Sequence, residues 1–180
     1  MRKELKFSII KTTKYRIFFI GFYEGKIKKL LLEYKFNEKT YISNYFVETI
    51  VNEKKFFNIL RRYDYIIPVP MYKLNKKSRG YNQSEIIAKK LAKILHIEYI
   101  NNYLVKIKNN KKQSLLTRIE RIENVKNAYM IKDFEMIKNK KVILLDDIYT
   151  TGNTVNECVK ELRKARPKSI DILVIAKTKL

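Results

Sequence analysis

Two apolar runs near the C-terminus, separated by one helical segment, constrain the fold more than any other feature of the sequence. Residues 141–146 (KVILLD) and 170–177 (IDILVIAK) are apolar at consecutive positions rather than at alternating ones. Strands of this kind are covered on both faces, as in parallel sheets. Between the two runs, apolar residues recur at the spacing of one helix face: Val155, Cys158, Val159, Leu162 and Ala165. The order strand, helix, strand predicts an α/β fold, with a central mainly parallel sheet and helices on both faces.

Further strands and helices are predicted upstream of these runs. Residues 63–70 (YDYIIPVP) predict a short buried strand that stops at its prolines and continues into a loop. A helix follows, and its start has the capping-box spacing of Asn82 to Glu85. Residues 97–107 and 128–132 are two more strand candidates.

The first third of the chain is predicted to be largely helical, because residues 27–34 and 43–60 carry apolar positions at helical spacing. The run YRIFFIGFY, residues 15–23, is too short to span a bilayer and is interpreted as a strand or core segment. No linker interrupts the chain. We therefore expect one domain, residues 1–180, with a mainly helical N-terminal part (1–63) and a core (64–180).

The composition bears on partners and on the compartment. The formal charge is +22, but 31 of the 40 basic residues are lysines, spread through every segment. This dispersal, together with the many Ile, Asn and Tyr residues, favours an AT-rich coding bias over a dedicated DNA site, and predicts weak, sequence-blind nucleic-acid binding. A single cysteine excludes an internal disulfide and indicates a reducing compartment, so a cytoplasmic protein is expected.

The segment DDIYTTGNT directly follows the apolar run of residues 142–145 and precedes the predicted helix. The carboxyl end of a parallel strand is where open α/β sheets bind ligands. Threonine hydroxyls and the positive end of a helix suit a phosphate, and Gly152 suits a tight turn. Asp146 and Asp147 would repel a phosphate, so they suit sugar hydroxyls or a magnesium ion. The segment therefore predicts a sugar-phosphate site. A plainer alternative is a strand end followed by a helix cap, since Thr154 and Glu157 also have capping-box spacing.

The same segment resembles the phosphoribosyl pyrophosphate (PRPP) signature of type I phosphoribosyltransferases. Three further segments resemble the ComF family of competence-associated phosphoribosyltransferase-like proteins. They are IIPVPMYKLNKKSRGYNQSEIIAKKLAK, KKQSLLTRIERIENVKNAYMI and FYEGKIKKLLLEYKF. Many ComF relatives also carry a cysteine-rich zinc module, which this chain with its one cysteine lacks.

The resemblance implies a role for particular residues. Asp146 and Asp147 would contact the ribose hydroxyls and magnesium, directly or through water, and with Arg79 would form the catalytic set. The 5′-phosphate would be held by Thr150, Thr151, Gly152, Asn153 and Thr154. The pyrophosphate would be handled by Arg79, Gly80, Asn82 and Gln83. A mobile loop within residues 106–113 would cover the site through Lys111, Lys112 and Gln113.

Three functions stay open at this point. The chain is a PRPP-dependent transferase with Mg²⁺ as cofactor, or a PRPP-binding regulator without turnover, or a competence protein that binds single-stranded DNA. The acceptor substrate is not indicated, and a homodimer is among the open oligomeric states. Nucleotide-binding folds of the Walker and dinucleotide types are excluded, because neither G-x-x-x-x-G-K-[ST] nor G-x-G-x-x-G occurs.

Overall fold

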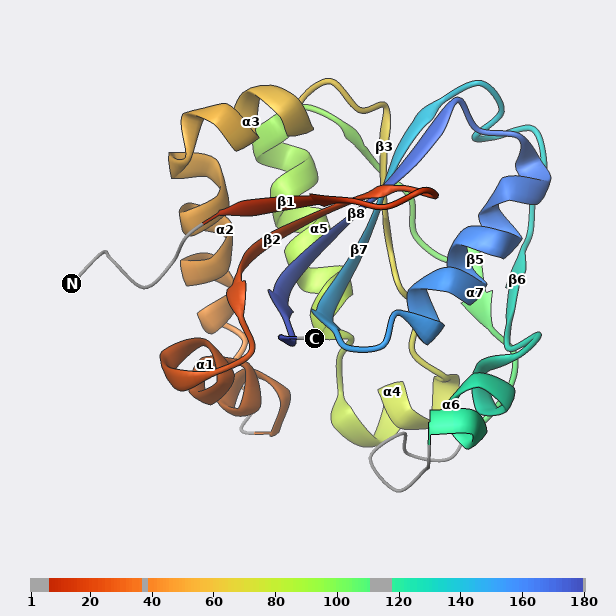
Figure 1. Cartoon of the computed structure of the whole chain (residues 1–180), viewed down its shortest axis with the longest axis horizontal. Helices are drawn as coiled ribbons and strands as arrows, with labels where there is room; N and C mark the ends of the chain where they lie inside the picture. Colours follow the sequence, from red (N-terminus) through yellow and green to blue (C-terminus); the bar gives the residue numbers. More distant parts are fainter. Residues whose placement is uncertain (1–6, 37–38, 111–117, 180) are drawn as a thin grey trace.

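A twisted six-stranded sheet forms the centre of the protein (Figure 1). The structure is a computed structural model and describes residues 7–36, 39–110 and 118–179. The strand order is β1-β2-β8-β7-β3-β4, and every pairing is parallel except that of β1 with β2. The six strands are β1 (Ser8–Lys11), β2 (Arg16–Phe22), β3 (Tyr65–Pro68), β4 (Glu98–Tyr99), β7 (Lys141–Tyr149) and β8 (Ser169–Lys177). The expected mainly parallel sheet is confirmed.

Helices cover both faces of the sheet, as expected. One face packs against α1 (Gly25–Phe36), α2 (Ile42–Asn52), α3 (Lys54–Leu60) and α5 (Gln83–Leu95). The other face packs against α7 (Asn153–Leu162) and a second sheet of two antiparallel strands, β5 (Leu104–Lys106) and β6 (Tyr129–Ile131). Figure 1 shows the two groups on opposite sides of β7 and β8. Short helices α4 (Lys73–Arg79) and α6 (Arg118–Val125) and the 3-10 turn Arg163–Ala165 complete the chain.

The central strands form because their apolar residues are buried on both faces. Ile143 and Leu145 of β7 pack into the core beneath α5, whereas Val142 and Leu144 pack into the core beneath α7. The helix between β7 and β8 buries the apolar face expected for it, including Cys158. Consecutive apolar positions were therefore the correct signal for a strand covered on two sides.

Three local features differ from the sequence expectations. The N-terminal part adds strand β1 to the sheet, besides its three helices, whereas the segment 15–23, interpreted as a strand or core segment, is confirmed as β2. The loop expected between residues 70 and 83 contains helix α4. The strand candidate at residues 97–107 is two strands, β4 and β5, which belong to different sheets. Among the described residues, no helix is long and apolar enough to cross a membrane.

Candidate functional site

The turn between β7 and α7 lies at the carboxyl end of the central strand. Gly152 occupies the N-cap of α7 in a left-handed conformation, with φ of 78°. Its carbonyl accepts a hydrogen bond of 2.7 Å from the Asn156 N–H. A Cβ at position 152 would overlap the Tyr149 hydroxyl, so both the backbone angle and the space require glycine.

The capping-box spacing of Thr154 to Glu157 does not cap helix α7. Helix α7 begins at Asn153, and no side chain caps it. The Glu157 carboxylate accepts a hydrogen bond of 3.0 Å from the Asn127 N–H. The turn is held instead by a residue from the β1-β2 hairpin, because the Tyr15 hydroxyl donates to Asn156 Oδ1 at 2.8 Å and lies 3.3 Å from the Tyr149 hydroxyl.

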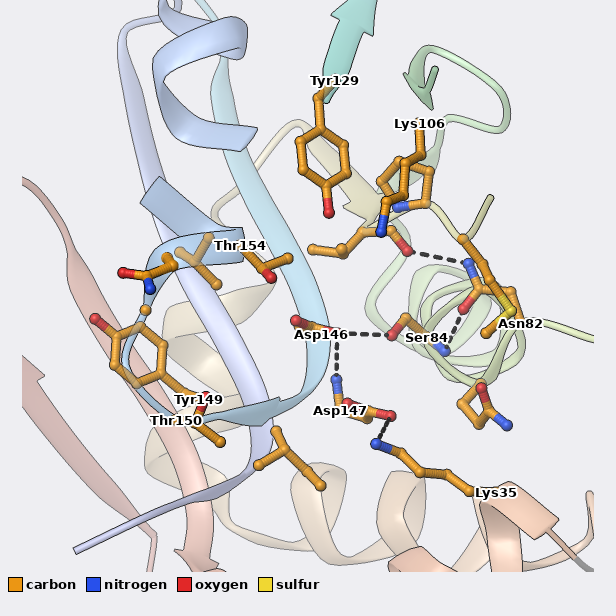
Figure 2. A pocket seen from close by; sticks show the side chains of 18 of the residues that line it. Lys35, Asn82, Ser84, Lys106, Tyr129, Asp146, Asp147, Tyr149, Thr150 and Thr154 are labelled. Atoms are coloured by element: carbon orange, nitrogen blue, oxygen red, sulfur yellow. Dashed lines mark hydrogen bonds and ion pairs between the residues drawn. The ribbon is translucent and has the colours of Figure 1, made fainter. Parts of the chain in front are cut away.

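A cavity of about 450 Å³ opens beside this turn (Figure 2). The structure brings most of the predicted site residues to its wall: Asn82, Gln83, Asp146, Asp147, Thr150, Gly152, Asn153 and Thr154. Thr151 is exposed and is not part of the lining. Gly80 is also outside it, and its N–H already donates to the Lys76 carbonyl at 2.8 Å. The side chain of Arg79 and the loop residues Lys111, Lys112 and Gln113 lie outside the described part of the structure.

The two acids of the motif point in different directions, because successive side chains of a strand alternate between its faces. Asp147 is directed toward the α1 side, where its Oδ2 lies 2.6 Å from the Lys35 ammonium. Asp146 Oδ1 accepts hydrogen bonds from the Asp147 N–H at 2.9 Å and from the Ser84 hydroxyl at 3.3 Å. Two adjacent residues of one sequence motif therefore have different surroundings.

Asp146 is the acid with the strongly perturbed ionisation. Asp146 is half-buried in the wall of the cavity. This burial, followed by the charge of Asp147, raises its pKa from 3.8 to about 7. The Lys35 ammonium opposes the shift, as do the hydrogen bonds to the carboxylate. A pKa raised in this direction is what an acid–base group working at neutral pH requires.

The loop from β3 to α5 forms the wall opposite the turn. The Asn82 side chain is 7% exposed and is held at both ends, because Nδ2 donates to the Val69 carbonyl at 3.0 Å and Oδ1 accepts from the Ser84 N–H at 3.1 Å. The predicted cap at Asn82 is thus confirmed, whereas Glu85 forms an ion pair of 2.6 Å with Lys76. These bonds fix Ser84 at the start of α5, within reach of Asp146.

The small sheet β5-β6 contributes a third wall. Lys106 and Tyr129 face each other across this sheet, with the ammonium 5.7 Å from the ring centroid. Burial lowers the pKa of Lys106 and raises that of Tyr129, whose hydroxyl is hydrogen-bonded to Thr154. Figure 2 shows both side chains on the opposite side of the acids from Lys35. An anionic ligand in the cavity would therefore meet a cation on each side.

Several lining residues were given no role from the sequence, among them Lys35, Ser84 and Tyr129. All three fall within segments already singled out for their resemblance. Lys106 begins the segment expected to be a mobile loop, and the structure places it in β5. Lys35 and Ser84 belong to helices and carry no local signal of their own. Each reaches the acids only because the fold brings helix ends next to the end of β7.

Comparisons with known proteins agree with this fold. The family model of the phosphoribosyl transferase domain matches residues 81–179, which is more than half of the chain. Competence protein F of Haemophilus influenzae is 32% identical over 165 residues, which cover 88% of this chain and 71% of that protein. DNA utilization protein YhgH of Escherichia coli O157:H7 is 26% identical over 115 residues, covering 64% of this chain and 50% of the relative.

The solved structures that match include two phosphoribosyltransferases. A purine phosphoribosyltransferase of Pyrococcus horikoshii Ot3 is 19% identical with a TM-score of 0.46, covering 75% of this chain and 84% of that one. An adenine phosphoribosyltransferase of Thermoanaerobacter pseudethanolicus is 15% identical with a TM-score of 0.47, covering 78% and 83%. The extent of the domain match and the identity to competence protein F together decide the assignment. The chain belongs to the phosphoribosyl transferase domain family and, within it, to the ComF group of competence protein F.

Proposed function

We propose that the protein binds PRPP in the cavity beside β7 and transfers its 5-phosphoribosyl group to an acceptor, releasing pyrophosphate. The observation that carries this proposal is the pairing of an anion-binding turn with two carboxylates in one cavity. The start of α7 offers backbone N–H groups and the positive end of a helix dipole to a 5′-phosphate. Asn153 and Thr154 line the cavity at this helix start.

The carboxylates suit the sugar part of the ligand. Both line the cavity next to the turn, so a ribose bound through its phosphate would present hydroxyls to them. A carboxylate accepts such hydrogen bonds strongly. Because positive charge develops on the ribose as pyrophosphate leaves, negative charge beside the ring stabilises the transition state. Asp147 holds its carboxylate in place through its pair with Lys35, and Asp146 adds a carboxyl group whose pKa is raised by burial.

Magnesium is the proposed cofactor, and the residues that line the cavity suit an ion that is held mainly by the bound ligand. No group of three His, Cys, Asp or Glu side chains that could hold a metal occurs in the described part of the chain. A hard cation prefers oxygen ligands and keeps several waters. The residues therefore suit an ion that arrives on the oxygens of the pyrophosphate and reaches Asp146 through water. When bound, magnesium would neutralise charge on the leaving group.

Calorimetric titration with PRPP, with and without magnesium, tests the binding step. A pyrophosphate-release screen across nucleobases and amines then tests turnover. Saturable binding at one site and release with at least one acceptor are expected. Binding without release for every acceptor would instead support a PRPP-binding regulator. No binding of PRPP under either condition would refute both.

A second candidate function, binding of single-stranded DNA, is favoured by a basic hollow at the opposite end of the sheet. This hollow has a volume of about 470 Å³ and is lined by five cations, Lys11, Lys14, Arg16, Arg163 and Lys168. Its one acid, Asp171, is already paired with Arg16 at 2.7 Å. Relatives named for competence and DNA utilization make nucleic acid a reasonable ligand to test.

Fluorescence anisotropy with labelled oligonucleotides of several lengths and sequences tests this candidate. Binding should be weak, should increase with length, should ignore sequence and should fade steeply with salt, because it rests on phosphate contacts. The variant Lys14→Glu/Lys168→Glu should lose it, while Lys54→Glu/Lys55→Glu on α3 is the matched control. Tight binding that persists at high salt, or equal loss in both variants, would contradict a role for the hollow.

A further inference from the structure

Lys35 places an ammonium group directly on one of the two motif acids. Its Nζ lies 2.6 Å from Asp147 Oδ2, and the two side chains are only 20% and 15% exposed. Lys35 belongs to the last turn of α1, far from the motif in sequence, and it lines the cavity. Figure 2 shows it reaching the acids from the side opposite Lys106.

The fold holds Lys35 in this position. Its neighbour Tyr34 is fully buried, and the Tyr34 hydroxyl donates to the Gln83 carbonyl at 2.9 Å. The Tyr81 hydroxyl in turn donates to the Tyr34 carbonyl. The end of α1 is thereby tied to the loop that forms the facing wall of the cavity. An exposed lysine gains little from an ion pair, but a lysine whose backbone is fixed beside its partner loses less freedom when the pair forms.

This pairing bears on how Asp147 can interact with a metal. The ammonium already neutralises the carboxylate, and a divalent cation at the same group would be repelled by the lysine. Asp146 by itself offers only part of a direct site, because its Oδ1 already accepts bonds from Ser84 and from the Asp147 N–H. Neutral hydroxyl donors meet no such repulsion. Asp147 still has a second oxygen that can accept a hydrogen bond.

We propose that the Lys35 ammonium is a permanent cation of the site. It leaves Asp147 able to accept hydrogen bonds from hydroxyl groups, and it prevents Asp146 and Asp147 from binding a divalent metal without another ligand. The sugar part of this inference rests on the proposed PRPP function, whereas the metal part does not. Lys35 is a positioning residue that acts through Asp147. A metal ion then enters the cavity only together with an anionic ligand.

The experiment titrates Mn²⁺ into the ligand-free protein and follows the loss of its free electron paramagnetic resonance signal. The wild type should show no saturable site. Lys35→Met should gain one, because the repulsive charge is gone and Asp147 is uncovered. Lys35→Arg should behave as wild type. Lys29→Met, an exposed lysine of the same helix, is the matched control and should also behave as wild type.

The double variant Lys35→Met/Asp147→Asn shows whether the new metal site is Asp147, because it should lose the Mn²⁺ binding that Lys35→Met gains. Far-ultraviolet circular dichroism confirms that each variant is folded, and Lys35→Gln repeats the test if the methionine variant is not. Unchanged Mn²⁺ binding in both folded Lys35 variants overturns the proposal. A wild-type Mn²⁺ site that Asp147→Asn removes overturns it as well.

A second readout separates this proposal from the proposed function. Ribose 5-phosphate should bind Lys35→Met about fivefold more weakly than wild type, because Asp147 loses the partner that orients it for the sugar hydroxyls. Inorganic phosphate, which lacks those hydroxyls, should be affected less. Equal weakening for the two ligands would overturn the claim that Lys35 orients Asp147 for the sugar hydroxyls. If the wild type binds neither of these ligands nor PRPP, the proposed function fails, and the Mn²⁺ result still decides whether Lys35 keeps metal from the acids.

Discussion

Replacing Gly152 by alanine tests the geometry of the turn on which the site depends. Two costs follow from the structure. An L-residue at φ of 78° costs about 1–2 kcal/mol relative to glycine. The new Cβ also overlaps the Tyr149 hydroxyl and ring, so the ring must shift and lose its contact with Tyr15. Because this end of the ring is half-buried beside the cavity, the shift adds about 0.5–1.5 kcal/mol, the net worth of one hydrogen bond. Gly152→Ala should therefore lower the free energy of unfolding by about 1.5–3.5 kcal/mol.

Gly25→Ala is the matched control. Gly25 also has positive φ, 50°, but nothing lies within 4 Å of a Cβ built there. Only the backbone cost of about 1–2 kcal/mol applies. Urea unfolding followed by circular dichroism measures both variants, and each kcal/mol corresponds to about 2–4 °C in Tm for a chain of this size. On a Tyr149→Ala background, Gly152→Ala should cost only the backbone part. Equal costs for Gly152→Ala and Gly25→Ala in the wild-type background would refute the overlap argument.

The other predictions concern the chemistry of the site. Asp146→Asn/Asp147→Asn should abolish magnesium-dependent pyrophosphate release while leaving appreciable ribose 5-phosphate affinity; if release survives, the acids have no role in turnover. Thr154→Val should weaken ribose 5-phosphate binding about tenfold or more, because a hydrogen bond to a charged group is worth about 1.5–3 kcal/mol. Thr151 is exposed, so Thr151→Val should have a smaller effect, and titration calorimetry compares the two variants. Burial and the Asp147 charge raise the pKa of Asp146 from 3.8 to about 7. The folded protein therefore binds this proton more tightly than the unfolded chain, and the free energy of unfolding should decrease as pH rises through that interval. Urea midpoints across pH should show this decrease in wild type and not in Asp146→Asn.

The sequence by itself determined the central strands and the turn. Two runs of consecutive apolar residues predicted buried strands, and β7 and β8 confirm them. Asp146, Asp147 and Gly152 were found because each belongs to one continuous segment, in which strand, turn and helix start are neighbours along the chain. Local patterns of this kind depend on backbone geometry and burial, and both leave periodic signals in sequence.

Only the tertiary structure decided how the two acids differ. Lys35 reaches Asp147 from the end of α1, and Ser84 reaches Asp146 from a helix start 62 residues away in sequence. Tyr15 steadies the turn by bonding Asn156, 141 residues away. A lysine on a helix in a chain of charge +22 has nothing in its local sequence to set it apart. Its role arises because long-range packing places one ammonium beside one carboxylate, and electrostatic interactions depend on that distance rather than on separation along the chain.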